Sequence, residues 1–112
     1  MNVMLTTFEI IDANPDIPIE RKEVDFPNDP GYDQLSSIIS PILEGAFMEH
    51  VFVIHNGEYT DMFVDEQGAL KELPINKRAS EIYNENMRIH TGYVGCGCIF
   101  GKAVLFDRRV WF

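Results

Sequence analysis

The chain has 112 residues, 46% of them hydrophobic and 24% charged, which fits one folded domain over residues 1–112 and excludes a disordered segment. Its formal net charge of −9 at pH 7 opposes contact with a phosphate backbone, so we expect no direct binding to nucleic acid. No apolar run approaches the roughly 20 residues of a membrane-spanning helix, and residues 1–5 lack a basic leader, so we expect a cytoplasmic protein without membrane contact.

Two extended segments and a turn begin the chain. Residues 4–11 and 19–26 have the composition of strands, and charged side chains interrupt the second segment, as they do in exposed edge strands. The sequence Pro-Asn-Asp-Pro-Gly at residues 27–31 is a strong turn signal. We therefore predict two strands followed by a turn.

A helix is predicted after this turn. Its apolar residues have the i, i+3, i+4, i+7, i+8 spacing of one helical face: Leu35, Ile38, Ile39, Ile42 and Leu43. An apolar face of this kind predicts packing on a sheet. Pro41 is expected to kink or shorten the helix, and Gly45 is expected to end it.

The middle of the chain predicts a hairpin. Asn56-Gly57 lies between extended runs at residues 51–54 and 59–64, and Asn-Gly is a strong signal for a two-residue hairpin turn. The acidic sequence Asp-Glu-Gln-Gly at residues 65–68 then turns the chain again. Residues 70–73 are predicted to return as a short strand.

A second helix and further strands complete the predicted fold. Asn76 is a favourable N-cap for a helix that extends to about residue 88. Residues 93–106 and 110–112 are rich in strand-forming residue types. The order ββαβββαββ with short connections predicts an α+β domain, in which an antiparallel or mixed sheet carries both helices on one face.

The start of the second helix is the candidate ligand site. Asn76, Lys77 and Arg78 lie beside the free N–H groups of a first helical turn, an arrangement that suits a compact anionic ligand such as phosphate. Two basic residues also break the usual preference for acidic side chains at this end of a helix. In the alternative interpretation, these basic side chains pair with the acidic members of the same candidate site, which are Asp61, Asp65 and Glu66.

Cys96 and Cys98 are the two cysteines, and their spacing does not match the usual zinc pattern. We expect both to be buried core residues, and we assign no metal ligand and no cofactor. The alternative is a metal-dependent enzyme that uses Cys96, Cys98 and a histidine. No nucleophile elbow or nucleotide-binding fingerprint is present, so binding is favoured over catalysis.

The chain ends in aromatic and basic residues. Arg108, Arg109, Trp111 and Phe112 are typical of interfaces, although the last residues could also form an edge strand. Residues 1–72 carry 15 acidic and 3 basic side chains, whereas residues 73–112 carry 3 acidic and 6 basic side chains. Attraction between such halves would favour a homodimer.

Three motifs follow one another in the second half of the chain. They are Asp-Met-Phe-Val-Asp-Glu-Gln-Gly at residues 61–68, Leu-Pro-Ile-Asn-Lys-Arg-Ala-Ser-Glu-Ile-Tyr at residues 73–83 and Gly-Lys-Ala-Val-Leu-Phe at residues 101–106. This set resembles a family of bacterial and phage proteins called domain of unknown function 3846. The resemblance implies a small α+β domain from a bacterial or mobile-element genome. It supplies no activity, so no catalytic residue is carried over.

These features predict a small accessory protein that acts by binding. Its expected partner is a protein or a compact anionic ligand, in the phage or mobile-element setting that the resemblance implies. The alternative is an acidic protein that mimics nucleic acid and inhibits a host defence or DNA-handling enzyme, because carboxylates on one surface can be spaced like phosphates.

Overall fold

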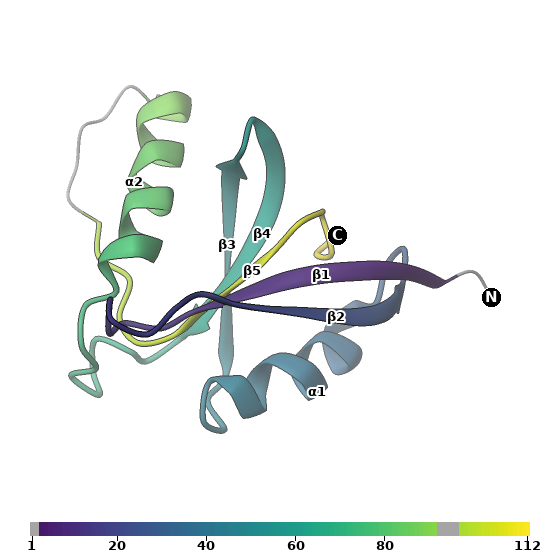
Figure 1. Cartoon of the computed structure of the whole chain (residues 1–112), viewed down its shortest axis with the longest axis horizontal. Helices are drawn as coiled ribbons and strands as arrows, with labels where there is room; N and C mark the ends of the chain where they lie inside the picture. Colours follow the sequence, from purple (N-terminus) through teal and green to yellow (C-terminus); the bar gives the residue numbers. More distant parts are fainter. Residues whose placement is uncertain (1–2, 92–96) are drawn as a thin grey trace.

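Figure 1 shows the computed structural model, which describes residues 3–91 and 97–112. The elements in chain order are β1 (Val3–Ile11), β2 (Glu20–Pro27), α1 (Gly31–Ile42), β3 (Met48–His55), β4 (Glu58–Asp65), α2 (Lys77–Thr91) and β5 (Ala103–Phe106). Within the described residues, five strands form one sheet in the order β2-β1-β5-β4-β3, and every neighbouring pair is antiparallel. The predicted α+β class with an antiparallel sheet and two helices is confirmed.

The β3–β4 hairpin turns at Asn56-Gly57, as predicted. Both turn residues have positive φ, 54° and 80°, which a type I′ turn requires. This two-residue turn fixes the register, so that His50 lies opposite Phe63 and Phe52 lies opposite Asp61. Because directly opposed residues share a face and side chains alternate along a strand, His50 and Asp61 lie on the same face of the sheet.

Both faces of the sheet are buried at its centre. On β4, Met62 and Val64 belong to one buried apolar cluster and Phe63 belongs to another. Helix α1 packs in the cluster of Phe63, whereas α2 packs in the cluster of Met62, and the two helices are well separated in Figure 1. The helices therefore lie on opposite faces rather than on the one face that was predicted. The reason is that the central strands are apolar on both sides.

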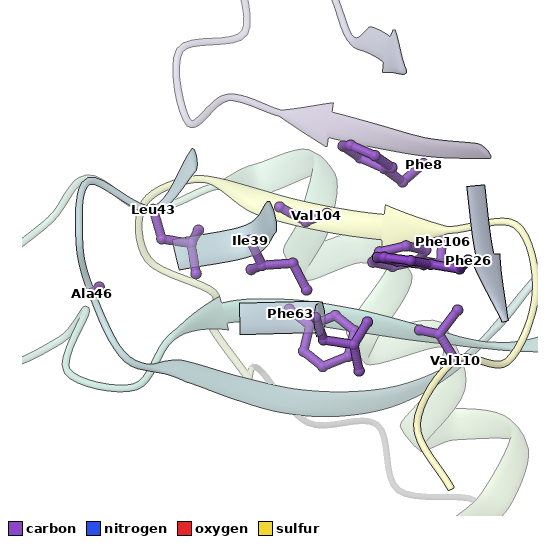
Figure 2. Close-up of a cluster of buried hydrophobic side chains, with 10 residues drawn as sticks. Phe8, Phe26, Ile39, Leu43, Ala46, Phe63, Val104, Phe106 and Val110 are labelled. Carbon is purple, nitrogen blue, oxygen red and sulfur yellow. The ribbon is translucent and has the colours of Figure 1, made fainter. Parts of the chain in front are cut away.

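An aromatic cluster forms the core on the α1 face (Figure 2). Leu35 and Ile39 of the helix pack in a cluster with Phe8, Phe63 and Phe106 of the sheet. The ring centre of Phe106 is 5.3 Å from that of Phe8 and 5.8 Å from that of Phe63. Burial of each large apolar side chain contributes about 1.5–3 kcal/mol, so this cluster fixes α1 on the sheet.

Helix α1 ends close to the predicted place. Pro41 lies inside its last turn, so this residue does not confine the helix to its first turns. Gly45 has a φ of 84°, and its N–H donates to the carbonyl oxygen of Ser40 at 2.8 Å. Glu44, with a φ of 59°, takes the left-handed position that directly follows the C-cap Leu43, and Gly45 is the next residue of the same capping motif. The helix thus ends where Gly45 predicted, with Glu44 in the position that glycine usually occupies.

Two predicted strands are absent from the described residues. Residues 66–72 form consecutive turns in which Glu72 has a φ of 56°, and Leu70 is 83% exposed, so residues 70–73 do not pair with the sheet. Of the predicted β-rich tail, Ala103–Phe106 forms β5 and residues 110–112 have no regular structure. Residues 93–96 of that prediction lie outside the described part of the chain.

Candidate functional site

The segment after β5, residues 107–112, is anchored by a buried carboxylate. Asp61 on β4 has no exposed surface, and its Oδ2 accepts hydrogen bonds from the backbone N–H groups of Val110 at 2.7 Å and Trp111 at 2.9 Å. Val110 is buried in the same apolar cluster as Phe63 (Figure 2). A buried charge is stable only when protein donors satisfy it, so Asp61 and this backbone hold each other in place.

Asp61 also orients an imidazole. Its Oδ1 lies 2.6 Å from His50 Nε2, which is within hydrogen-bond distance. A carboxylate accepts such a bond from the imidazole N–H. The ring of His50 stacks on the indole of Trp111, with ring centres 5.2 Å apart and planes inclined by 13°. Asp61, His50 and Trp111 therefore form one connected unit.

Arg108 connects the C-terminal segment to the β1–β2 hairpin. Its Nε donates to Thr6 Oγ1 at 3.0 Å. Its two Nη groups donate to the backbone oxygens of Pro27 and Asn28, each at 3.0 Å. The guanidinium thus binds within its own chain, and the interface role of Arg108 stays a prediction.

Arg109 orders an exposed aromatic residue. Its guanidinium carbon lies 4.9 Å from the ring centre of Phe52 and 5.6 Å from that of Phe112. Its Nε is 4.0 Å from Asp61 Oδ1. Cations bind favourably over aromatic faces, so Arg109 holds the end of the chain against the sheet.

Exposed aromatic side chains surround Trp111, and we call Tyr32, Phe47, Trp111 and Phe112 the aromatic surface. Phe47 is 73% exposed, Phe112 is 64% exposed and Tyr32 is 49% exposed. The ring of Tyr32 contacts Trp111 edge-on, with ring centres 6.5 Å apart. This surface is continuous with the unit that Asp61 anchors.

Two hollows lie in the aromatic surface. The larger, which we call the aromatic hollow, has a volume of about 590 Å³ and is lined by Tyr32, Phe47, Glu49, His50, Glu66 and Trp111, together with a methionine of β3. The smaller, which we call the second hollow, has a volume of about 250 Å³. It shares Tyr32 and Trp111 with the first and adds Asp29 and Phe112. Tyr32 and Trp111 therefore separate two adjoining depressions.

Asn76, predicted for an anionic ligand site, holds α2 to the sheet. Its buried side chain accepts a hydrogen bond from the N–H of Ala79 at 3.0 Å, which confirms the predicted N-cap. Its Nδ2 donates to the backbone oxygens of Ile11 at 2.8 Å and Gly101 at 2.9 Å. Every polar atom of this side chain is thus used inside the fold.

The basic members of the same predicted site differ in exposure. Arg78 donates from Nη2 to the backbone oxygens of Asp12 at 2.8 Å and Asn14 at 3.1 Å. Lys77 is exposed at the first position of α2. One basic side chain therefore supports the β1–β2 connection, and the other faces solvent.

The acidic members of the predicted site have other partners. Asp65 accepts hydrogen bonds from Lys71 Nζ and from the backbone N–H of Gln67, both at 2.8 Å. Glu66 is exposed and lines the aromatic hollow. Among the described residues, no ion pair joins the hairpin acids to Lys77 or Arg78. The six predicted residues are therefore not brought together in one site.

The cysteine prediction is partly outside the described residues. Cys98 is exposed rather than buried as predicted, and it lies in an irregular segment instead of the predicted strand. Cys96 lies outside the described part. Within residues 3–91 and 97–112, no three His, Cys, Asp or Glu side chains gather as a metal site would require.

Sequence patterns missed part of the aromatic surface. Trp111 and Phe112 were predicted as interface residues, whereas Tyr32, Phe47 and His50 were not. The Asn-Gly turn contains the signal for His50, because counting back from a two-residue turn places it diagonal to Asp61. Tyr32 lies on a helix and Phe47 precedes a strand, so only tertiary packing brings them to Trp111.

No family model, curated protein or solved structure matches the chain. The resemblance to domain of unknown function 3846 therefore stays a prediction from the three motifs. In the described part of the chain, neither helix has the length and apolar character needed to cross a membrane.

Proposed function

We propose that the protein is a non-catalytic binding domain that recognises a protein partner through the aromatic surface. The observation that supports this most directly is the anchoring of Trp111. The backbone N–H of Trp111 donates to the buried carboxylate of Asp61, and the indole ring packs on His50 and Tyr32. Aromatic residues are enriched at protein interfaces, and prior ordering lowers the entropic cost of binding.

The shape of the surface favours a protein over a compact ligand. Small ligands are usually enclosed by concave sites that bury most of their surface. Here Phe47 and Phe112 line open depressions and are 73% and 64% exposed, so these depressions do not enclose a small ligand. Exposed aromatic residues on a fixed backbone suit contact with a partner protein.

A photo-crosslinking experiment tests this proposal. Phe47 or Phe112 is replaced by the photoreactive p-benzoyl-phenylalanine in the full chain, and the protein is irradiated in an extract of its source organism. We expect both positions to give the same protein adduct, and we expect excess unlabelled protein to suppress it. Ile17, which is 44% exposed in the β1–β2 connection, is the control position and should not give this adduct.

Other outcomes would contradict the proposal. Equal adduct formation at position 17 would mean that the aromatic surface is not the contact. An adduct with a DNA-handling enzyme that forms from β2, where Glu20, Glu23 and Asp25 are exposed, would instead favour the nucleic-acid mimic. A compact anionic ligand at α2 would be favoured if phosphate shifted the amide resonances of residues 76–78 and no adduct formed.

A further inference from the structure

We infer that the partner presents a basic segment whose arginine or lysine side chains enter the aromatic hollow and the second hollow. This inference rests on the proposed function, because it assigns the chemistry of the partner for the same surface. It also differs from the anionic ligand that the sequence predicted for the start of α2. The charge and aromatic character of the lining residues carry it.

Carboxylates are the free charges of both hollows. Glu66 lines the aromatic hollow, Asp29 lines the second hollow, and both are exposed. Glu49 also borders the aromatic hollow, but it alternates with His50 along β3, so its side chain points to the opposite face of the sheet. The imidazole of His50 also lines the aromatic hollow, but its Nε2 is hydrogen-bonded to Asp61. No lysine or arginine is among the lining residues of either hollow. Complementarity of charge therefore favours a cationic occupant.

The aromatic walls favour a cation for a second reason. A guanidinium or ammonium group is attracted to the face of tryptophan, tyrosine or phenylalanine. Tyr32 and Trp111 line both hollows, so two cationic side chains of one segment would flank the same pair of rings. Arginine suits such a site better than lysine, because its planar group stacks on rings and binds carboxylates through two donors.

The chain already contains one contact of this type. Arg109 lies over the rings of Phe52 and Phe112, and its Nε is 4.0 Å from a carboxylate oxygen of Asp61. The aromatic hollow repeats this combination of rings and carboxylates without an arginine of its own. Its volume of about 590 Å³ lies within the range of about 300–1,000 Å³ that is usual for ligand pockets.

Trp111 provides the signal for a direct test, because it is the single tryptophan of the chain. The full chain is titrated at low salt with four blocked tetrapeptides, made of arginine, lysine, glutamate or an uncharged Gly-Leu-Ser-Leu sequence. We expect a saturable change in Trp111 emission with the arginine peptide and weaker binding of the lysine peptide. The glutamate and uncharged peptides should leave the emission unchanged.

Matched variants separate the site from overall charge. The double variant Asp29→Asn/Glu66→Gln is expected to weaken binding of the arginine peptide about tenfold, since each exposed charge contact is worth up to about 1 kcal/mol. Glu23→Gln/Asp25→Asn removes the same charge from exposed positions of β2, at the far edge of the sheet. This control should change the Kd less than about twofold.

Three outcomes would overturn the inference. If both double variants bound the arginine peptide equally weakly, the peptide would be attracted by the net charge of the protein and not by the two hollows. A change in emission with the uncharged peptide and none with the arginine peptide would identify an apolar partner segment. If Asp29→Asn/Glu66→Gln retained the photo-crosslinked partner, the protein-binding proposal would stand and the basic segment would be ruled out. Conversely, if the arginine peptide bound in a way that depended on Asp29 and Glu66 but no partner adduct formed, the cation site would stand and the proposed function would be ruled out.

Discussion

Asp61 explains how a short irregular segment keeps a defined position. Residues 107–112 have no regular strand or helix after β5, so secondary structure does not satisfy their backbone groups. Asp61 satisfies two of them, and His50 supplies a third donor to the same carboxylate. Burial of this charge costs free energy, which its hydrogen bonds offset only while all partners stay in place.

Replacement of Asp61 by alanine is therefore expected to destabilise the fold and release the aromatic surface. Loss of one partner of a buried charged unit costs about 3–5 kcal/mol, and the N–H groups of Val110 and Trp111 would remain without their acceptor. Urea unfolding measures the loss of stability. At zero denaturant, the emission of Trp111 should move to longer wavelength, because the indole becomes more exposed to water.

The control for this prediction is Asp25→Ala. Asp25 is an exposed carboxylate on β2, so its removal should change the free energy of unfolding by no more than about 0.5 kcal/mol. If Asp61→Ala behaved like Asp25→Ala, the carboxylate would not anchor the C-terminal segment.

Helix α2 is held to the sheet by the buried side chain of Asn76, as the C-terminal segment is held by Asp61. One side chain caps the helix through Ala79 and also joins it to Ile11 of β1 and to Gly101 before β5. Asn76→Ala removes three hydrogen bonds and leaves two carbonyl oxygens without their donor. We expect a loss of about 3 kcal/mol, from roughly 1 kcal/mol for the cap and 1–3 kcal/mol for the unsatisfied groups.

Two further variants make the test of Asn76 specific. Asn76→Asp keeps an acceptor for Ala79 but has no amide donor, so it should be at least as destabilising as Asn76→Ala when both are unfolded in urea. Lys77→Ala, at the exposed neighbouring position, should stay within about 0.5 kcal/mol of the unmodified protein. Recovery of most of the stability in Asn76→Asp would mean that only the cap matters.

Short sequence motifs predicted a structural element correctly where the residues of that element alone fix its backbone conformation. The Asn-Gly turn predicted the β3–β4 hairpin, and Asn76 predicted the start of α2 within one residue. The predicted strand at residues 70–73 failed because Leu70, although apolar, is 83% exposed in a series of turns. Apolar character alone does not distinguish a strand from such a turn.

The helix faces and the aromatic surface required the tertiary structure. The short run Met62-Phe63-Val64 is apolar on both sides, so its sequence permits a helix on either face. Tyr32, Phe47 and Trp111 come from three distant parts of the chain, and no local pattern connects them. Prediction therefore identified the C-terminal aromatic residues and missed the residues that complete their surface.

In the described part of the chain, three basic side chains of the second part contact the acidic first part. Arg78 binds backbone oxygens at residues 12 and 14, and Arg108 binds those at residues 27 and 28. Arg109 approaches Asp61. Three basic side chains of the second part are thus placed against the first, which leaves less basic surface for a charge-driven homodimer. The homodimer stays a prediction.

The sheet carries one core on each face, and adjacent residues of β4 supply both. Phe63 and Met62 are fully buried, the first in the cluster of α1 and the second in the cluster of α2. Because the same strands support both clusters, we expect neither face to unfold alone. Met62→Ala should lower the free energy of unfolding by about 2–5 kcal/mol and Phe63→Ala by about 3–5 kcal/mol.

The decisive measurement compares two signals in one denaturation experiment. Trp111 fluorescence reports the α1 face, where the indole contacts Phe63, whereas far-UV circular dichroism reports both helices. In Met62→Ala, which alters only the α2 face, both signals should move to the same lower midpoint, as a two-state transition requires. If circular dichroism were lost at lower urea while the fluorescence midpoint stayed unchanged, the two cores would unfold separately. The anchoring of the aromatic surface would then depend on the α1 face alone.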